Sequence, residues 1–247
     1  RVETIKAKAS DIVSAISTNG TDDRIAITYY GDTASYLGTD NTWASSGFTN
    51  AFWDVTSANV STIQTAINNI SNLSTTAQTD NSGMELSFAN SIMENSGVNY
   101  TADGTRNCVI IFMSDGVPGA DAKNDTVNAA KNVIAKAHSM KSAGAFIYSA
   151  LVGEDASGFD TRTYMDAVSS KYPAATSMTM VNGVYTELGG ANVDGVSYTA
   201  NLGDITLENF MDFGPTIGRE LVKNEAVGIA NLNDEAIIYE ELSPAFK

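Results

Sequence analysis

Hydrophobic residues recur every three or four positions in several stretches of the chain, and this is the period of a helix that buries one face. The first stretch begins at Val2 and continues through Ile16, and Asn19-Gly20 supplies the left-handed stop that ends such a helix. Later stretches predict further helices at these apolar positions: Val60, Ile63, Ile67 and Ile70; Met84, Phe88 and Ile92; Val127, Ala130, Val133, Ile134, Ala137 and Met140; Tyr164, Met165 and Val168; Leu207, Phe210, Met211, Ile217 and Leu221.

Short runs of β-branched and aromatic residues lie between these helices and predict strands. The run "RIAITYY" covers residues 24–30, and "TASYL" over residues 33–37 is interpreted as its hairpin partner or as an edge strand. "CVIIFM" (108–113) and "AFIYSALVG" (145–153) carry apolar residues on both faces, which is typical of central parallel strands that helices cover on each side. "TSMTMV" (176–181) predicts a further strand.

This alternation of strands and helices predicts an α/β fold with a doubly wound, mostly parallel sheet flanked by helices. The domain is expected to cover residues 1–223. Its Gly-rich stretch at 182–203 is interpreted as an insertion or an irregular hairpin. Residues 224–247 have a different pattern and are expected to form a C-terminal strand that leads toward a following domain.

Composition narrows the range of partners. The 247 residues are 43% hydrophobic, which suffices for one large core. Fourteen basic and 29 acidic residues give a formal net charge of -15, so we expect no nucleic-acid partner, because phosphate binding needs basic clusters. No apolar stretch reaches the roughly 18 residues of a membrane span, so no membrane insertion is expected. Lys6 and Lys8 are expected on solvated helix faces, and the lone Cys108 is expected to be a buried thiol.

The triplet Ser114-Asp115-Gly116 directly follows the apolar run at 108–113 and is the main candidate for chemistry. In open parallel sheets, ligands bind beyond the carboxyl ends of the strands. Asp before Gly is also common as a turn or helix-capping residue, and this dipeptide alone favours neither that role nor a functional one. Phosphatases of the haloacid dehalogenase type carry a nucleophilic aspartate where this chain has Met113. No glycine-rich phosphate loop follows a strand, and His138 is the only histidine, so the chain is expected not to be an enzyme.

Oxygen-bearing side chains in two loops predict a site for a hard cation. The polar loop "TTAQTDNSGMELSFA" (75–89) carries hydroxyls and Asp80 and leads into a predicted helix. Magnesium prefers carboxylate, hydroxyl and water ligands and keeps several waters, so a few side chains from separate loops suffice. Together with "FMSDG" (112–116), this loop resembles the metal-ion-dependent adhesion site of von Willebrand factor type A domains.

The resemblance assigns metal-binding roles to two residues of this chain. Asp115 matches the family's aspartate, and Thr79 is the best match to its threonine, with Thr76 as the alternative because the spacing from Thr79 to the next helix departs from the family form. The implied cofactor is Mg²⁺, or Mn²⁺ or Ca²⁺. Asp115 would hold the ion directly or through water.

One part of the family pattern is missing. The Asp-x-Ser-x-Ser motif occurs nowhere in the sequence, and neither does the strand that precedes it. In the family this strand lies between the counterparts of "IAITY" and "CVIIFM", so its absence would expose two apolar strand edges. We therefore expect a fragment, a partly observed chain, or a domain that another segment completes.

The function implied by the resemblance is ligand binding without turnover. An acidic group of a protein partner would complete the coordination of the cation. Similarity to A domains of Gram-positive pili and surface adhesins implies an extracellular location at the cell surface, in the cell wall or a pilus. The partner would then be host extracellular matrix or another surface subunit. The alternative is a structural subunit of a surface filament or pilus with a degraded metal site.

Overall fold

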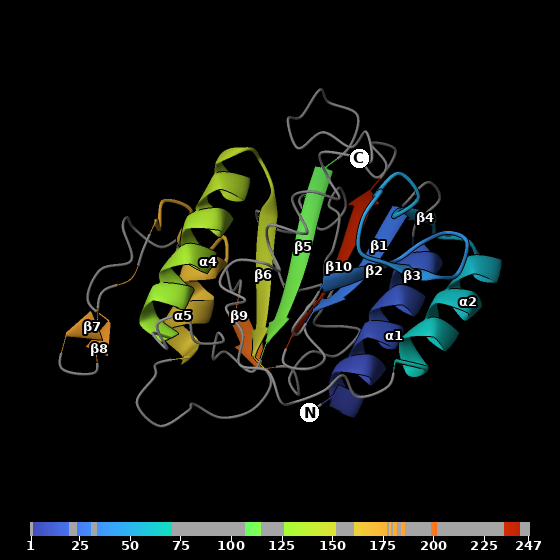
Figure 1. Ribbon diagram of the computed structural model, residues 1–247, viewed down its shortest axis with the longest axis horizontal. Helices are drawn as coiled ribbons and strands as arrows, with labels where there is room; N and C mark the ends of the chain where they lie inside the picture. Colours follow the sequence, from blue (N-terminus) through green and yellow to red (C-terminus); the bar gives the residue numbers. More distant parts are fainter. Residues whose placement is uncertain are drawn as a thin grey trace.

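The computed structural model describes eleven parts of the chain: residues 2–19, 24–30, 34–70, 107–114, 126–151, 161–176, 178, 180–181, 184–185, 199–201 and 235–242. The helices in these parts are α1 (Val2–Asn19), α2 (Ser57–Asn68), α4 (Thr126–Ser142) and α5 (Thr161–Val168). The strands are β1 (Arg24–Tyr30), β2 (Ala34–Leu37), β3 (Trp43–Ala44), β4 (Trp53–Asp54), β5 (Asn107–Ser114), β6 (Phe146–Leu151), β7 (Met180–Val181), β8 (Val184–Tyr185), β9 (Thr199–Asn201) and β10 (Glu235–Leu242). In Figure 1, α1 and α2 lie at one end of the main sheet and α4 and α5 at the other.

The main sheet is mixed, and most of its strand pairs are antiparallel. Its order is β3-β2-β1-β10-β5-β6-β9, and β4 also pairs with β1. Within the described strands, only β5 with β6 and β6 with β9 run parallel. The predicted doubly wound, mostly parallel sheet is therefore wrong. Apolar residues on both faces identify β5 and β6 as buried strands, but burial does not fix the direction of a neighbour, and β10 runs opposite to β5.

Strand β10 occupies the position between β1 and β5. Its backbone pairs antiparallel with β1 from Arg24↔Glu241 to Tyr30↔Glu235. On its other side it pairs antiparallel with β5 from Glu235↔Ser114 to Leu242↔Asn107. This is the place where the sequence predicted a missing central strand. The division into a domain over 1–223 and an exit segment over 224–247 stays a prediction, but residues 235–242 of that segment lie in the main sheet.

Three short strands follow α5. β7, within the predicted strand at 176–181, pairs with β8 in a separate two-stranded sheet. The strand that extends the main sheet beyond β6 is β9, which lies in the Gly-rich stretch at 182–203. The predicted helices around residues 84–93 and 207–221 lie outside the described residues.

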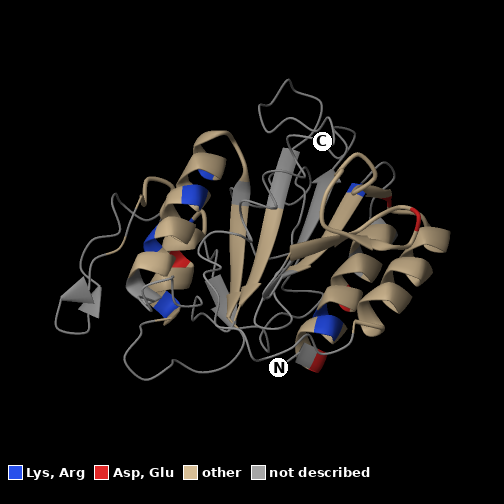
Figure 2. Cartoon of the chain, in the orientation of Figure 1, with Lys and Arg blue, Asp and Glu red and all other residues tan. Residues whose placement is uncertain are grey.

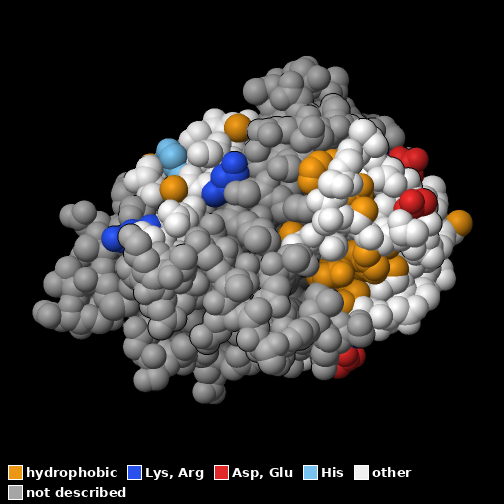
Figure 3. Space-filling view, viewed as in Figure 1, with side chains coloured by type: hydrophobic (Ala, Val, Ile, Leu, Met, Phe, Trp, Pro, Cys, Tyr) orange, Lys and Arg blue, Asp and Glu red, His pale blue; other side chains and the backbone are white. Residues whose placement is uncertain are grey.

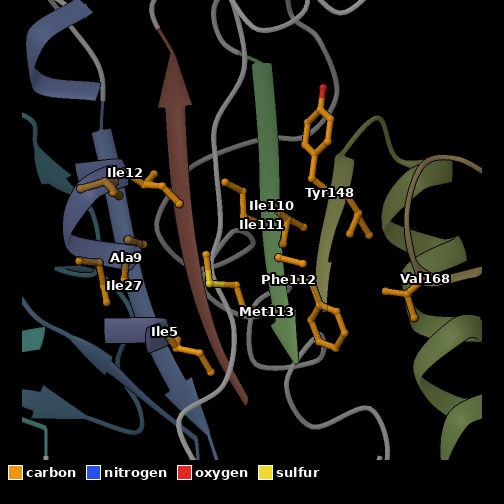
Figure 4. Packing of buried hydrophobic residues seen from close by; sticks show 14 of the residues in the cluster. Ile5, Ala9, Ile12, Ile27, Ile110, Ile111, Phe112, Met113, Tyr148 and Val168 are labelled. Carbon is orange, nitrogen blue, oxygen red and sulfur yellow. The ribbon is translucent and has the colours of Figure 1, made fainter. Parts of the chain in front are cut away.

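The buried faces of the helices agree with the predicted period. Helix α1 buries Ile5, Ala9 and Ile12, and Figure 4 shows these side chains beside Ile27 of β1. Helix α4 ends at Ser142, and Gly144 follows two residues later with a φ of 106°, a left-handed conformation that glycine adopts without strain. The buried apolar residues of both ends of the sheet belong to one core cluster.

Polar contacts join α1 to α2. The Gln64 side chain donates hydrogen bonds to the Ser10 carbonyl at 2.9 Å and to the Ser14 hydroxyl at 2.7 Å. The Lys6 amine donates to the Ile70 carbonyl at 2.9 Å and forms an ion pair with Glu3 at 3.0 Å. Lys6 is buried, so its predicted place on a solvated face is wrong. Its aliphatic stem packs between the helices while its amine satisfies a carbonyl just after the end of α2.

The loop between β2 and α2 carries four aromatic residues. Trp53 is buried, and its indole Nε1 donates a hydrogen bond to the Leu37 carbonyl at 2.9 Å. Trp43, Phe48 and Phe52 are partly buried against the core. In Figure 3, hydrophobic side chains reach the surface on the right of the view, where Figure 1 places β2 and β3. The loop therefore packs on the body of the protein through its aromatic residues.

Replacing Trp53 with phenylalanine is expected to lower the free energy of unfolding by about 1–2 kcal/mol, because the Leu37 carbonyl loses its buried donor. Urea denaturation measures this change. Trp43→Phe is the matched control: Trp43 is partly exposed and meets Tyr29 edge-to-face at 4.6 Å, a contact that a phenyl ring retains. Equal losses in the two variants would contradict the role of the indole hydrogen bond.

Candidate functional site

The strongest candidate site lies where β5 ends. Ser114 is the last residue of β5 and is fully buried. In register it lies beside Leu151, the last residue of β6, and beside Glu235, the first residue of β10. Asp115 is the next residue in the sequence. The chain therefore leaves the middle of the sheet immediately before the candidate carboxylate.

Several strands end at the same edge of the sheet. β1 and β5 are both antiparallel to β10 and so run in the same direction as each other, and β6 and β9 are parallel to β5. We call the edge formed by Tyr30, Ser114, Leu151 and Asn201 the carboxyl-end edge. Figure 1 shows it at the lower end of the view, where α1 also begins. Loops that leave neighbouring parallel strands at one edge are a common place for binding sites.

The predicted metal ligands themselves, Asp115 and Thr79, lie outside the described residues, as does the alternative Thr76. Their assignment stays a prediction, and what the structure adds is the position of the strand end before Asp115. In the part of the chain that the structure describes, no group of three or more His, Cys, Asp or Glu side chains is placed to hold a metal ion.

Basic side chains are spread over separate elements. Figure 2 shows the Lys and Arg residues of the described segments mainly along α4 and near the start of α1, without one continuous patch in this view. The ion pair between Lys171 and Asp166, at 2.6 Å, closes the turn after α5. These positions offer no concentrated positive surface for a polyanion in the view shown.

Lys141 forms a polar centre that the sequence did not predict. Its amine donates hydrogen bonds to the carbonyls of Ala167, Ser169 and Tyr172, each at 2.9 Å. Burial lowers the pKa of Lys141 from 10.5 to about 7. A basic residue in the last turn of a helix, such as Lys141 in α4, is expected to interact with the carbonyls at the end of that helix. The Lys141 amine instead bonds carbonyls of residues that follow both α4 and β6 in the chain.

The position of Lys141 separates it from the carboxyl-end edge. The turn that it binds also contains Ser170, whose backbone N–H donates to the Ile147 carbonyl at 2.8 Å, near the start of β6. The Ser170 hydroxyl accepts a hydrogen bond from the Ile147 N–H, also at 2.8 Å. Because β6 ends at the carboxyl-end edge, Lys141 belongs to the opposite edge. Its role is to join α4, the end of α5 and the start of β6.

Comparisons with known proteins found no match among protein-family models, curated proteins or solved structures. Across the described residues, no helix combines the length and the apolar character needed to cross a membrane.

Proposed function

We propose that the chain is a cell-surface ligand-binding module that uses a divalent cation at the carboxyl-end edge to capture an acidic group of a protein partner. The observation that carries the proposal is the end of β5. This strand is buried in the middle of the sheet and stops at Ser114, one residue before Asp115. A carboxylate that follows a central strand at this edge is well placed to hold a ligand.

The chemistry of the loop residues supports a hard cation. Asp115 would supply a carboxylate oxygen and Thr79 a hydroxyl oxygen, which are ligand types that Mg²⁺ prefers over nitrogen and sulfur. Mn²⁺ and Ca²⁺ accept the same ligands. With few protein ligands, the ion keeps exchangeable water positions, and a carboxylate from a partner can replace one of them. This is capture without covalent chemistry.

The resemblance of "FMSDG" and "QTDNSGMEL" to the adhesion site of von Willebrand factor type A domains also supports the proposal. It suggests an extracellular module of a pilus or surface adhesin, with host extracellular matrix or another surface subunit as the partner. The net charge of -15 suits binding of a cation. The proposal rests on these loop residues and on the end of β5, and it does not need the family's parallel sheet.

Isothermal titration calorimetry with Mg²⁺ tests the proposal. The unmodified chain is expected to bind, and Asp115→Ala is expected to weaken binding by about 100-fold or more, which is about 2.8 kcal/mol, because the divalent cation loses its only proposed carboxylate ligand from this chain. Asp54→Ala is the control, since Asp54 is an exposed carboxylate on β4 beside the start of β1 and away from the carboxyl-end edge. An unchanged affinity in Asp115→Ala would overturn the assignment.

The same titration separates the two threonines. Thr79→Val is expected to weaken Mg²⁺ binding while Thr76→Val leaves it unchanged; the reverse result would move the ligand to Thr76. If the unmodified chain binds neither Mg²⁺, Mn²⁺ nor Ca²⁺, cation-dependent capture is excluded, and the structural subunit of a surface filament becomes the better description.

A further inference from the structure

The position between β1 and β5, here called the central slot, is lined by buried apolar residues. On the β1 side Ile25 and Ala26 are fully buried, and Ile27 is 3% exposed. On the β5 side all residues of 110–113 are at most 2% exposed. Side chains alternate between the two faces of a strand, so both edges of the slot are apolar on both faces. A strand in such a position is expected to be apolar throughout.

Strand β10, which occupies the central slot, does not meet that expectation. Its sequence is "EAIIYEEL", with glutamate at three of eight positions. Glu240 lies in register with Ile25 of β1 and Val109 of β5. Neighbouring pairs on the same face place Ile238 beside Ile27 and Ile111. Glutamate is rarely buried without a partner because its charged form loses hydration. The apolar residues in the middle of β10 therefore match the apolar edges of the slot, whereas Glu240 and Glu241 near its end do not.

The topology allows β10 to leave without breaking other strand pairs. It is the last described strand in the chain order, and residues 202–234 separate it from β9 in the sequence. The elements on each side of the slot have contacts of their own. Gln64 joins α2 to α1 beside β1, and Lys141 joins α4 to the end of α5 beside β6. Removal of β10 would leave two structured halves with unpaired apolar edges.

We infer that the central slot is a strand-acceptor site, in which an extended, uncharged apolar strand of a partner protein displaces β10 and pairs with both β1 and β5. Backbone hydrogen bonds to two edges supply affinity, and the alternating side chains supply specificity. The preference over β10 comes from replacing Glu240 with an apolar residue between Ile25 and Val109. This site is separate from the proposed cation site and does not depend on it.

Two labelled peptides test the inference in the presence of EDTA, which removes divalent cations. One peptide has the β10 sequence, and the other carries the changes Glu235→Thr, Glu240→Val and Glu241→Thr. Fluorescence anisotropy is expected to show saturable binding of the changed peptide, at least about tenfold tighter than the β10 peptide, because the glutamate at the register position beside the fully buried Ile25 is replaced by an apolar residue. Equal affinities, or no binding of the changed peptide, would overturn the inference.

A reversible disulfide that holds β10 in the slot, here called the lock, shows whether the peptide enters the slot. Cys108 is in register with Glu241, and paired residues of antiparallel strands have Cα separations of about 4.5–5.5 Å, within the range of a disulfide. Glu241→Cys is therefore expected to form an intramolecular disulfide with Cys108. In the oxidised variant, peptide binding should disappear, and reduction should restore it.

The matched control is Glu241→Cys combined with Cys108→Ala, which removes the same glutamate but cannot form the lock. It should bind the changed peptide under oxidising and reducing conditions alike. Binding to the locked variant would place the peptide elsewhere and contradict the inference. Failure of the disulfide to form would contradict the register of β10. A disulfide between two chains, seen as a dimer on a non-reducing gel, would assign the slot to a second copy and overturn the apolar-partner assignment.

Discussion

Replacing Phe112 with alanine is expected to lower the free energy of unfolding by about 3–5 kcal/mol. Phe112 is fully buried in β5, and its register neighbours are Ile237 of β10 and Ser149 of β6. Figure 4 shows its ring directed into the core. The substitution removes a large apolar side chain and leaves a cavity that a central strand cannot close by moving. Because the free energy of unfolding of a typical domain is only about 5–15 kcal/mol, this loss is a large fraction of the total stability.

Urea denaturation followed by tryptophan fluorescence measures this loss. Phe52→Ala is the control, because Phe52 is only partly buried and meets the Arg24 guanidinium at 5.4 Å from its ring centre. Its loss is expected to be clearly smaller than that of Phe112→Ala. A loss below about 1 kcal/mol for Phe112→Ala would mean that β5 is not at the centre of the core.

At pH 10, where the charge of Lys141 costs little, Lys141→Met is expected to destabilise the protein by about 2–4 kcal/mol, because the carbonyls that the amine bonds lose their donor and each buried unsatisfied group costs about 1–3 kcal/mol. Methionine keeps much of the aliphatic stem and so isolates the effect of the amine. Lys136→Met, on the same helix, is the control for a change of charge. Equal stability of Lys141→Met and the unmodified protein would contradict the structural role of the amine.

The Lys141 amine also predicts a pH dependence. Its pKa is about 7 in the folded protein and 10.5 in the unfolded chain. Between these values the unfolded chain holds a proton that the folded protein has released, so stability from this group rises with pH, by at most about 1.4 kcal/mol per pH unit. The urea midpoint, measured from pH 7 to pH 10, reports this rise in stability. Tyr36 titrates above this pH range, because burial raises the pKa of its hydroxyl from 10.0. The rise should be absent in Lys141→Met.

Local pattern predicted much of the structure around the core. The period of α1 identified Ile5, Ala9 and Ile12 as buried, and the uninterrupted apolar run of β5 identified residues 110–113 as buried. These predictions succeed because the spacing of apolar residues indicates whether one face or both faces of an element are buried. Gly144 marks the end of α4 for an equally local reason, its positive φ.

Pairing between distant strands was not predictable in the same way. Residues 235–242 have a strand-like pattern, but nothing in "EAIIYEEL" specifies that they lie between β1 and β5 or run antiparallel to both. The glutamates of this strand even favour a solvated edge. The Lys141 amine bonds a turn that follows β6 and α5 in the chain, so the position of Lys141 in the last turn of α4 does not predict which carbonyls it contacts.

The candidate site also combines a local feature, which the sequence predicts, with a long-range contact, which it does not. The sequence identifies Asp115 by its place after an apolar strand, and the structure describes that strand up to Ser114 and places Leu151 beside it. Whether Thr79 joins Asp115 depends on the packing of a loop against the carboxyl-end edge, a long-range contact that local spacing does not determine. The metal site therefore stays a prediction.

The most direct test of the cation site is an NMR titration with Mn²⁺, whose unpaired electrons broaden the resonances of nearby nuclei. A cation held by Asp115 is expected to cause early loss of the backbone amide signals of Ser114 and Leu151 at the carboxyl-end edge, no early loss for Trp43 and Ala44 of β3, and no such selectivity in Asp115→Ala. Early broadening at Trp43 and Ala44 while Ser114 and Leu151 keep their signals would contradict this assignment.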